Sequence, residues 1–195
     1  MTVSPSEQGT LPGVITIRPA VYSDDRGYFM ENWQQARYRE AGPPERFVQD
    51  NVSFSKRGVL RGLHFQHPAA QGKLVTVLRG EIFDVVVDVR YGSPTFGKST
   101  AYVLSQEDHQ QLYVPPDFAH GFLVTSDEAL VTYKCTDYYQ PRCEQTLLWN
   151  DATLAISWPT TTPILSEKDR RGRRLVDFES SELPAFSAHA SGSVV

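Results

Sequence analysis

Phe83-Asp84-Val85-Val86-Val87-Asp88-Val89-Arg90 is the clearest strand pattern in this 195-residue chain. In an extended strand, side chains alternate between two faces. Phe83, Val85, Val87 and Val89 would therefore share one face. The other face would carry Asp84, Val86, Asp88 and Arg90. Alternation over eight residues predicts a β-strand through this stretch.

Short runs of the same kind lie on both sides of this strand. They are Val14–Ile17, Leu74–Leu78, Ser99–Leu104, Gln111–Val114, Gly121–Val124, Leu130–Thr136 and Thr146–Trp149. Turn signals such as Pro115-Pro116-Asp117 separate them. Short helices are expected near Trp33–Glu40 and near Glu167–Arg173. Many short strands with few helices favour an all-β sandwich or barrel.

Length and composition indicate one ordinary globular domain. We expect a flexible N-terminal lead over residues 1–12, one domain over 13–179 and a loose tail over 180–195. The net charge of −4 disfavours a general nucleic-acid or anionic-membrane binder. No apolar run approaches the ~20 residues that span a bilayer. The first ten residues lack the basic and apolar regions of a signal peptide, so a cytoplasmic location is expected.

The densest polar cluster in strand-like sequence is Arg61-Gly62-Leu63-His64-Phe65-Gln66. Strict alternation would place Arg61 and His64 on opposite faces, but a bulge at Gly62 would bring them together, because glycine tolerates the required backbone. The pattern is also typical of a histidine whose hydrogen bonds are satisfied inside a half-buried strand. The residues alone leave both interpretations open.

A metal site is an alternative interpretation of the same segment. His64-x-x-His67 is an odd spacing that points the two rings to opposite faces of a regular strand. Gln71 and Lys73 stand where a carboxylate ligand would be needed, and a lysine repels a divalent ion. The sequence therefore predicts no metal site.

Two further segments carry candidate chemistry. His120 lies at the entrance to the strand that follows Pro115-Pro116, and strand ends often carry site residues. Tyr133 shares a strand face with Val131 and Cys135 and should point into the barrel, where a phenol can act as a general acid. Each is equally typical of a structural role: an interfacial histidine in a turn, or an amphipathic tyrosine in a core.

Taken together, the polar segments resemble one family. They are DDRGYFME (24–31), QDNVSFSKRGVLRGLHFQ (49–66), QGKLVTVLRGEIFDVVVDVRYGSPTFGK (71–98), PPDFAHGFLV (115–124), TYKCTDYY (132–139), LLWND (147–151), ISWP (156–159) and LSEKD (165–169). Their content and order are similar to those of the dTDP-4-keto-6-deoxyglucose 3,5-epimerases. The match runs from about Gly13 to Asp169, and its specificity lies in the joint agreement of many segments.

This resemblance implies a cupin-type jelly-roll fold with a few short helices, working as a homodimer without metal or cofactor. The substrate would be a dTDP-linked 4-keto-6-deoxyhexose, inverted at C3 and C5. The resemblance makes His64 the base, with Asp169 hydrogen-bonded to its ring. It makes Tyr133 the acid and Lys73 the cation that stabilises negative charge on the C4 oxygen.

The resemblance also implies the residues that bind the substrate. Arg61 and Lys168 would bind sugar or phosphate, and Arg26 would bind phosphate. Phe29, Glu31, Gln49 and Asn51 would surround the thymine. Asp84, His120 and Tyr139 would line the pocket.

Four other functions stay open at this level. A related enzyme that inverts C3 alone would use the same His and Tyr, and a ketoisomerase can share the scaffold. A non-catalytic sugar-binding cupin would have no use for Tyr133 together with Asp169. A metal-dependent cupin would need the paired His and Glu that this segment lacks.

Overall fold

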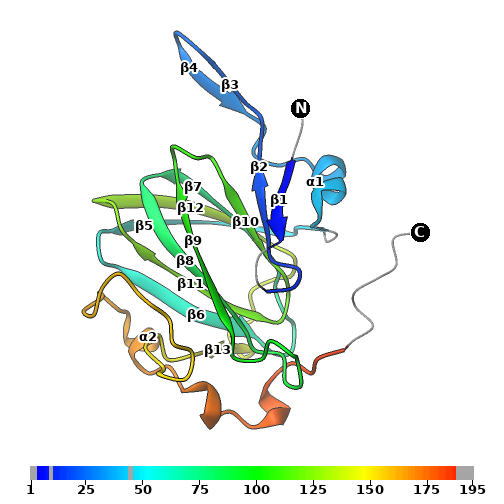
Figure 1. Cartoon of the computed structure of the whole chain (residues 1–195), viewed down its shortest axis with the longest axis vertical. Coiled ribbons are helices and arrows are strands. Elements are labelled where there is room, and N and C mark those ends of the chain that lie inside the picture. The colour runs from blue at the N-terminus through cyan, green and yellow to red at the C-terminus, as the bar shows by residue number, and fades with distance from the viewer. Residues whose placement is uncertain (1–3, 9–10, 44–45, 188–195) are drawn as a thin grey trace.

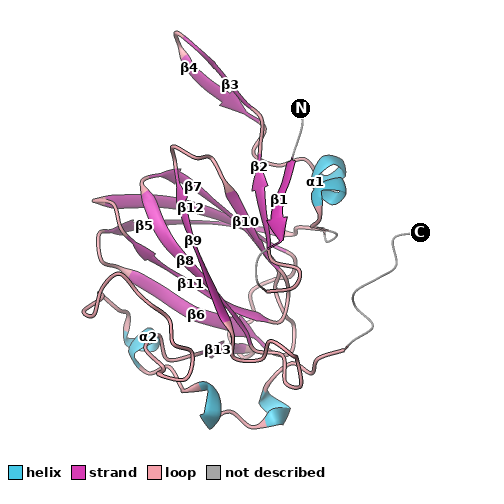
Figure 2. Cartoon of the chain, in the orientation of Figure 1, coloured by secondary structure: helices cyan, strands magenta, loops and turns pink. Residues whose placement is uncertain are grey.

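Two antiparallel sheets stack face to face in the computed structural model of the chain, which describes residues 4–8, 11–43 and 46–187 (Figure 1). The six-stranded sheet runs, in spatial order, β1 (Ser4–Gln8), β2 (Ile15–Arg18), β10 (Gln111–Val114), β7 (Lys73–Arg79), β12 (Glu128–Cys135) and β5 (Gln49–Lys56). The five-stranded sheet runs β13 (Glu144–Thr146), β6 (Leu60–Gln66), β11 (Phe118–Val124), β8 (Glu81–Asp88) and β9 (Ser99–Ser105). The prediction of an all-β jelly roll with a few short helices is confirmed, as Figure 2 shows.

The strand predicted from alternation at Phe83–Arg90 is present as β8, and both of its faces are buried. Ile82 and Val86 pack in the core between the sheets. Val85 and Val87 point the other way, into a second core on the outer face of the five-stranded sheet. The acidic positions are buried and paired, because an unpaired charge would be costly there. Asp84 contacts His120, and Asp88 accepts hydrogen bonds from Arg90.

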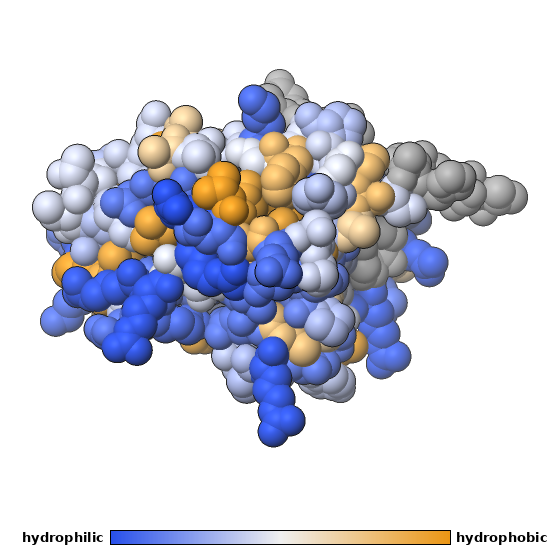
Figure 3. Space-filling model, turned by 90° about the horizontal axis from the view of Figure 1, so that it is seen from below, coloured by the Kyte–Doolittle hydropathy of each residue, from blue (hydrophilic) through white to orange (hydrophobic). Residues whose placement is uncertain are grey.

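The chain's C-terminal part covers that outer face. Leu154, Leu175, Phe178 and Leu183 belong to the second core. Short helices lie along this segment: α2 (Glu167–Arg170), η1 (Leu175–Asp177) and η2 (Ser180–Glu182). Seen from this side, the surface is largely hydrophilic with small apolar patches (Figure 3). The segment therefore acts as a layer that hides the apolar face of β8 and holds α2 beside β6.

Helix α1 (Gln35–Ala41) packs against the outer face of the six-stranded sheet. The Gln34 side chain caps its first turn, and it ends at Gly42, whose φ of +135° suits glycine. Buried Tyr38 joins Ile17 and Leu74 in a small apolar cluster beneath the helix. None of the helices in the described part of the chain has the length and apolar character needed to span a bilayer.

A two-stranded hairpin, β3 (Val21–Asp24) and β4 (Gly27–Met30), projects beyond the two sheets (Figure 1). Its aromatic side chains are largely exposed, with Phe29 at 64%. The ring of Tyr28 lies against that of His109, with ring centroids 4.6 Å apart. The hairpin thus contacts the body through Tyr28 and leaves aromatic side chains exposed to the surroundings.

The chain ends differ from the expected flexible lead and loose tail. Ser4–Gln8 pair with β2 as an edge strand, and Leu11 is buried. Residues 1–3 and 9–10 lie outside the described residues. Near the C-terminus, Leu183 is buried in the second core, and the Phe186 amide donates to the Tyr91 carbonyl. The chain is therefore packed against the body as far as Phe186. Residues 188–195 lie outside the described residues.

Two strand boundaries also differ from the sequence pattern. The strand expected at Thr146–Trp149 instead ends at Thr146, because Leu147 turns inward and forms an isolated bridge with Arg173. His120, expected at a strand entrance, lies inside β11 and pairs with His64 of β6. Strand β11 begins earlier because Phe118 and Ala119 are both buried apolar residues.

Strands β6 and β11 are joined through a bulge. His120 pairs with His64 and Phe122 pairs with Arg61, so Gly62 and Leu63 together oppose Gly121. Gly62 has a φ of +120°. A Cβ atom there would lie 2.6 Å from the Gly121 Cα and 2.8 Å from the His120 carbonyl oxygen. The bulge predicted at Gly62 is confirmed, and it requires glycine for both conformation and space.

We expect Gly62→Ala to lower the free energy of unfolding by roughly 2–5 kcal/mol, because positive φ and backbone overlap both oppose the new methyl group. Urea titration followed by intrinsic fluorescence measures this. Gly92→Ala is the matched control, since its φ is +85° and nothing lies within 4 Å of the new Cβ. That control should lose about 1–2 kcal/mol. Equal losses in the two variants would contradict the close approach of β6 and β11.

Candidate active site

The two sheets and α2 enclose a cavity of about 610 Å³. Its walls come from β5, β7 and β12 of one sheet, from β6, β11 and β13 of the other, and from α2. The bulge at Gly62 allows Arg61 and His64, which straddle it on β6, to line this same cavity. A cavity of this size with a few convergent polar groups is typical of a small-molecule site.

The shortest contact in the cavity joins His64 to Asp169. The His64 Nε2 atom lies 2.6 Å from Asp169 Oδ1, and the carboxylate is almost fully buried. Asp169 is itself held by Ser166, whose Oγ donates to Asp169 Oδ2 at 2.7 Å and accepts from the Asp169 amide at 3.1 Å. Ser166 is the N-cap of α2, so the helix start fixes the carboxylate. The predicted pairing of His64 with Asp169 is present.

Burial and Asp169 act in opposite directions on the His64 ring. Burial lowers the pKa of His64 below its ordinary value, while the hydrogen bond that His64 makes to Asp169 raises it. The net result is a lowered pKa, so the ring is neutral near pH 7. Burial alone would raise the pKa of Asp169. The hydrogen bonds from His64 and Ser166 lower it by more than burial raises it, so the net pKa is lowered and the group is a carboxylate.

Tyr133 and Lys73 stand on the wall formed by the other sheet. Tyr133 pairs with Val75 on β7, and Lys73 pairs with Cys135 on β12, so the two side chains are near neighbours. Burial raises the pKa of Tyr133, which keeps its phenol protonated. Burial lowers the pKa of Lys73. A base on one sheet thus faces a phenol and an amine on the other.

Three more predicted residues sit around this pair. Arg61 lines the cavity and donates from Nε to Ser55 Oγ at 2.9 Å. His120 also lines it, and its Nε2 lies 2.9 Å from both carboxylate oxygens of Asp84. Asp84 is fully buried behind His120 rather than part of the cavity wall. Asp84 therefore holds the His120 ring by a hydrogen bond from behind the cavity wall.

The rim contains the remaining predicted residues of the cavity. Gln49 and Asn51 share a face of β5 and are hydrogen-bonded to each other at 3.1 Å. Tyr139 donates its amide to Gln49 Oε1 at 2.9 Å. Lys168, beside Asp169 on α2, completes the rim.

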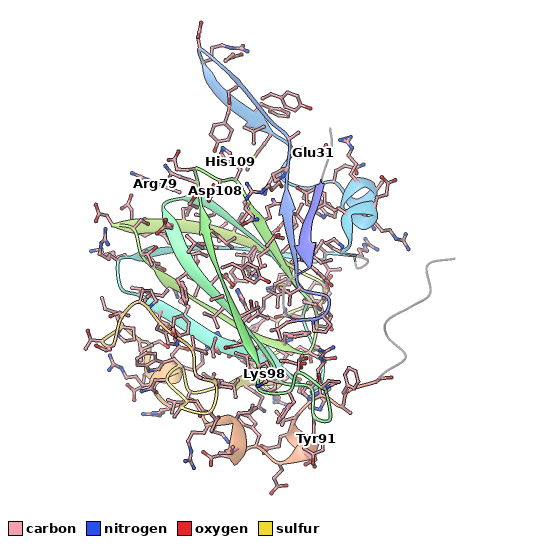
Figure 4. All side chains as sticks on the ribbon, in the orientation of Figure 1. Glu31, Arg79, Tyr91, Lys98, Asp108 and His109 are labelled. Carbon is pink, nitrogen blue, oxygen red and sulfur yellow. The ribbon has the colours of Figure 1, made fainter. Side chains whose placement is uncertain are left out.

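Arg26, Phe29 and Glu31 do not reach the cavity of their own chain. Arg26 and Phe29 are on the projecting hairpin, and the Arg26 side chain is 90% exposed and paired with Asp24. Glu31 lies at the base of the hairpin, near β2 and α1 (Figure 4), and forms an ion pair with Arg37 at 2.8 Å. Ten of the predicted residues therefore line one cavity, Asp84 lies behind it, and these three lie away from it.

Several lining residues were missed from the sequence. The most important is Glu144, on the three-residue strand β13, which no pattern marks as a strand or as a site. Ser166 also lines the cavity. Its spacing to Asp169, Ser-x-x-Asp, is a helix N-cap signal that would have found it. Gln66 and Gln71 line the cavity as well; both lie within the motif segments 49–66 and 71–98, but neither had been expected to line the site.

Metal-ligating side chains do not gather in the part of the chain that the structure describes, where no group of three or more His, Cys, Asp or Glu residues could hold an ion.

Comparison with known proteins gives consistent matches. The family model of dTDP-4-dehydrorhamnose 3,5-epimerase matches residues 8–177. An enzyme of that name from Methanothermobacter thermautotrophicus is 52% identical over 169 residues, covering 85% of this chain and 91% of the relative. One from Neisseria gonorrhoeae is 51% identical over 174 residues, covering 89% of this chain but 53% of the relative, so this chain spans about half of that protein's length.

A solved structure agrees with these relatives. The dTDP-6-deoxy-D-glucose-3,5-epimerase from Legionella pneumophila, in complex with dTDP-4-keto-L-rhamnose, superposes with a TM-score of 0.90 at 46% identity, covering 96% of this chain and 99% of the other. The family model, the relatives and the matching jelly roll agree. The chain belongs to the dTDP-4-dehydrorhamnose 3,5-epimerase family.

Proposed function

We propose that this chain inverts C3 and C5 of a dTDP-linked 4-keto-6-deoxyhexose by removing and returning a proton at each carbon. The observation that carries the proposal is the cavity itself, where the His64–Asp169 pair faces Tyr133 and Lys73 from the opposite sheet. The relative from Legionella pneumophila, whose structure holds dTDP-4-keto-L-rhamnose, supports the substrate class.

The chemistry follows from the ketone at C4. The carbonyl acidifies the C–H bonds at C3 and C5, so a base can remove either proton and leave an enolate. His64 takes the proton, and Asp169 stabilises the imidazolium that forms. The Lys73 ammonium stabilises the negative charge on the C4 oxygen. Tyr133 returns a proton to the opposite face, which inverts the carbon without any redox step.

The protonation states suit these roles. A base must be neutral before it acts, and the pKa of His64 is lowered by burial. An acid must carry its proton at neutral pH, and the pKa of Tyr133 is raised by burial. The environment thus separates the pKa values of two titratable groups on opposite walls of one cavity. Acid–base catalysis needs such an arrangement.

The rim suits the nucleotide. Arg61 and Lys168 supply positive charge for the pyrophosphate, while Gln49 and Asn51 carry the amide groups that read the edge of a base. Tyr139 and His120, whose ring is hydrogen-bonded to Asp84 behind it, complete the walls around the sugar. A nucleotide-linked substrate of this kind fits a cytoplasmic enzyme.

Arg26, Phe29 and Glu31 fit the proposal if two chains associate. They lie on or beside a hairpin that projects from the body, with Phe29 exposed. A homodimer would let this hairpin reach the cavity of the second copy, where Arg26 meets phosphate and Phe29 stacks on thymine. The exposed apolar side chains of edge strand β5, Val52 and Phe54, offer additional contact area for such a dimer.

We expect the wild-type protein to exchange the C3 and C5 protons of dTDP-4-keto-6-deoxyglucose in deuterated water, followed by proton NMR. His64→Ala should lose this exchange by about 10²–10⁴-fold, because the imidazole proposed to take the proton is gone. Tyr133→Phe should still exchange protons but should not invert, because His64 returns the deuteron to the face from which it took the proton.

The outcomes separate the alternatives. Exchange at C3 alone would identify a 3-monoepimerase. No exchange by folded wild-type protein that binds dTDP would overturn the catalytic proposal for this substrate. Exchange that survives in His64→Ala would overturn the role of His64.

Asp169→Asn should lower kcat/KM by about 10²–10⁴-fold and also change its pH dependence. The acidic limb of the wild-type profile reports protonation of His64. Its midpoint should lie below 6.5, the ordinary pKa of a histidine, because burial lowers the pKa of His64. Asp169 raises that pKa, so its removal should move the limb to still lower pH. A pH–rate profile of both proteins measures this. A limb that moves to higher pH in the variant would contradict the assigned electrostatics.

Co-expression of two inactive variants tests the shared cavity. His64→Ala keeps its hairpin, and the double variant Arg26→Ala with Phe29→Ala keeps its cavity. A mixed dimer would contain one complete site, so equal mixing should restore about a quarter of wild-type activity. Activity no higher than that of the separate variants would show that the hairpin does not serve the second copy.

A further inference from the structure

The loop between β12 and β13 uses side chains as partners for its backbone. The Tyr139 amide donates to Gln49 Oε1 at 2.9 Å, and the next amide, that of Gln140, donates to Gln66 Oε1 at 2.7 Å. Gln49 stands on β5 and Gln66 on β6, so the partners come from both sheets. Because backbone amides need a partner wherever water is excluded, these side chains determine the conformation of the loop.

The Gln66 side chain reaches the peptide groups on both sides of Tyr139. Its oxygen accepts from the Gln140 amide, and its Nε2 donates to the Tyr138 carbonyl at the longer distance of 3.4 Å. The same Nε2 donates to the Ala69 carbonyl at 2.7 Å, which fixes the orientation of the side-chain amide. Gln66 is only 4% exposed. A buried amide with these partners is a rigid support for the loop.

Gln71 adds a second connection to the same loop. Its Nε2 donates to the Asp137 carbonyl at 2.8 Å. Gln66 ends β6 and Gln71 lies two residues before β7, so both belong to the connection that crosses from one sheet to the other. This connection therefore holds residues 137–140 at the point where the two sheets meet beside the cavity.

Tyr139 is the residue that the loop brings to the cavity rim. It lines the cavity and is 47% exposed, so packing alone does not hold it. Its amide also holds the Gln49 side chain, which is proposed to read the edge of the base. A ring and an amide that are already in place need not be ordered when the ligand binds, which lowers the entropic cost of binding.

We propose that Gln66, assisted by Gln71, is a positioning residue for substrate binding: it holds the loop at residues 137–140 so that Tyr139 stands at the rim before the nucleotide-linked sugar arrives. The inference rests on the proposed function, because it concerns the same substrate. Gln66 acts through Tyr139 and takes no part in proton transfer. Its loss should therefore change KM and leave kcat nearly unchanged.

Steady-state kinetics with dTDP-4-keto-6-deoxyglucose tests this split. Gln66→Met keeps a similar volume and adds no charge, but it loses the hydrogen bonds to the loop. Its KM should rise about three- to tenfold, the range that one net hydrogen bond contributes, while kcat stays within about twofold of wild type. A fall in kcat at unchanged KM would overturn the proposal, since Gln66 would then act on the acid or the base.

Gln71→Met is a milder second variant, because Gln71 is less buried than Gln66 and a single hydrogen bond to the loop is removed. Its KM should rise about two- to threefold, again with kcat nearly unchanged. This variant keeps the proposal testable if Gln66→Met does not fold. An unchanged KM in Gln71→Met and in folded Gln66→Met would overturn the proposal.

A double-mutant cycle shows whether the effect runs through Tyr139. In a Tyr139→Ala background, Gln66→Met should raise KM by less than about twofold, because the ring that the loop positions is already absent. The full three- to tenfold rise in that background would overturn the proposal, since Gln66 would then act on the substrate directly or through another residue.

Limited digestion with trypsin reports on the loop without any substrate. Arg142 is exposed just beyond the loop, and cleavage after it requires the chain to open locally. Gln66→Met should release the fragment that begins at Cys143 about threefold faster than wild type or more, as followed by mass spectrometry. Cleavage after Arg57, in the turn between β5 and β6, should keep its wild-type rate, which separates local opening from general unfolding. Equal cleavage after Arg142 in the variant and in wild type would overturn the proposal.

Gln106→Met is the matched control for both measurements. The Gln106 side chain also holds a loop, since its Oε1 accepts from the Gly80 amide at 2.8 Å, but it lies outside the cavity. It should change neither KM nor cleavage after Arg142. Wild-type protein that does not convert the substrate would overturn the proposed function. Active wild type with an unchanged KM in folded Gln66→Met would overturn this inference alone.

Discussion

The close approach of Gly62 to Gly121 is the constraint on which the site depends. A regular strand would send Arg61 and His64 to opposite faces, leaving one of them outside the cavity. The bulge inserts one residue and turns both side chains to the same side. The space for this turn exists because neither glycine carries a Cβ atom at the crossing. Backbone packing thus determines where the proposed base points.

The second requirement is that His64 meets Asp169, which is 105 residues away in sequence. The apolar outer face of the five-stranded sheet provides the driving force. Val85 and Val87 must be covered, and the C-terminal segment covers them with Leu175 and Phe178. That burial holds α2 beside β6, where Ser166 and Asp169 are positioned at the helix start. Hydrophobic packing on one side of the sheet therefore supports polar chemistry on the other.

Alternation and turn signals allowed the all-β fold and most strands to be predicted, because they are local signals, whereas the cavity residues followed only from the resemblance to a known family. What the sequence could not give was set by long-range packing. Strand β13 has three residues and no alternation to reveal it, so Glu144 remained hidden. The chain ends looked loose from their composition, yet Leu183 is held by a core formed far away in sequence. Arg26 and Phe29 sit on a hairpin that does not line the cavity of its own chain, so proximity within one chain could not place them.

The site divides into a rigid interior and an adjustable rim, and the two parts suit different tasks. His64, Tyr133 and Lys73 stand on strands inside the two sheets, where burial shifts their pKa values and the paired strands hold their backbones in place. Proton transfer needs such fixed positions, because a small displacement of acid or base reduces the rate strongly. Lys168, by contrast, stands on the four-residue helix α2 at the rim, and its side chain is 49% exposed. A half-exposed side chain at the rim can adjust to a charged ligand without moving the buried groups on the strands.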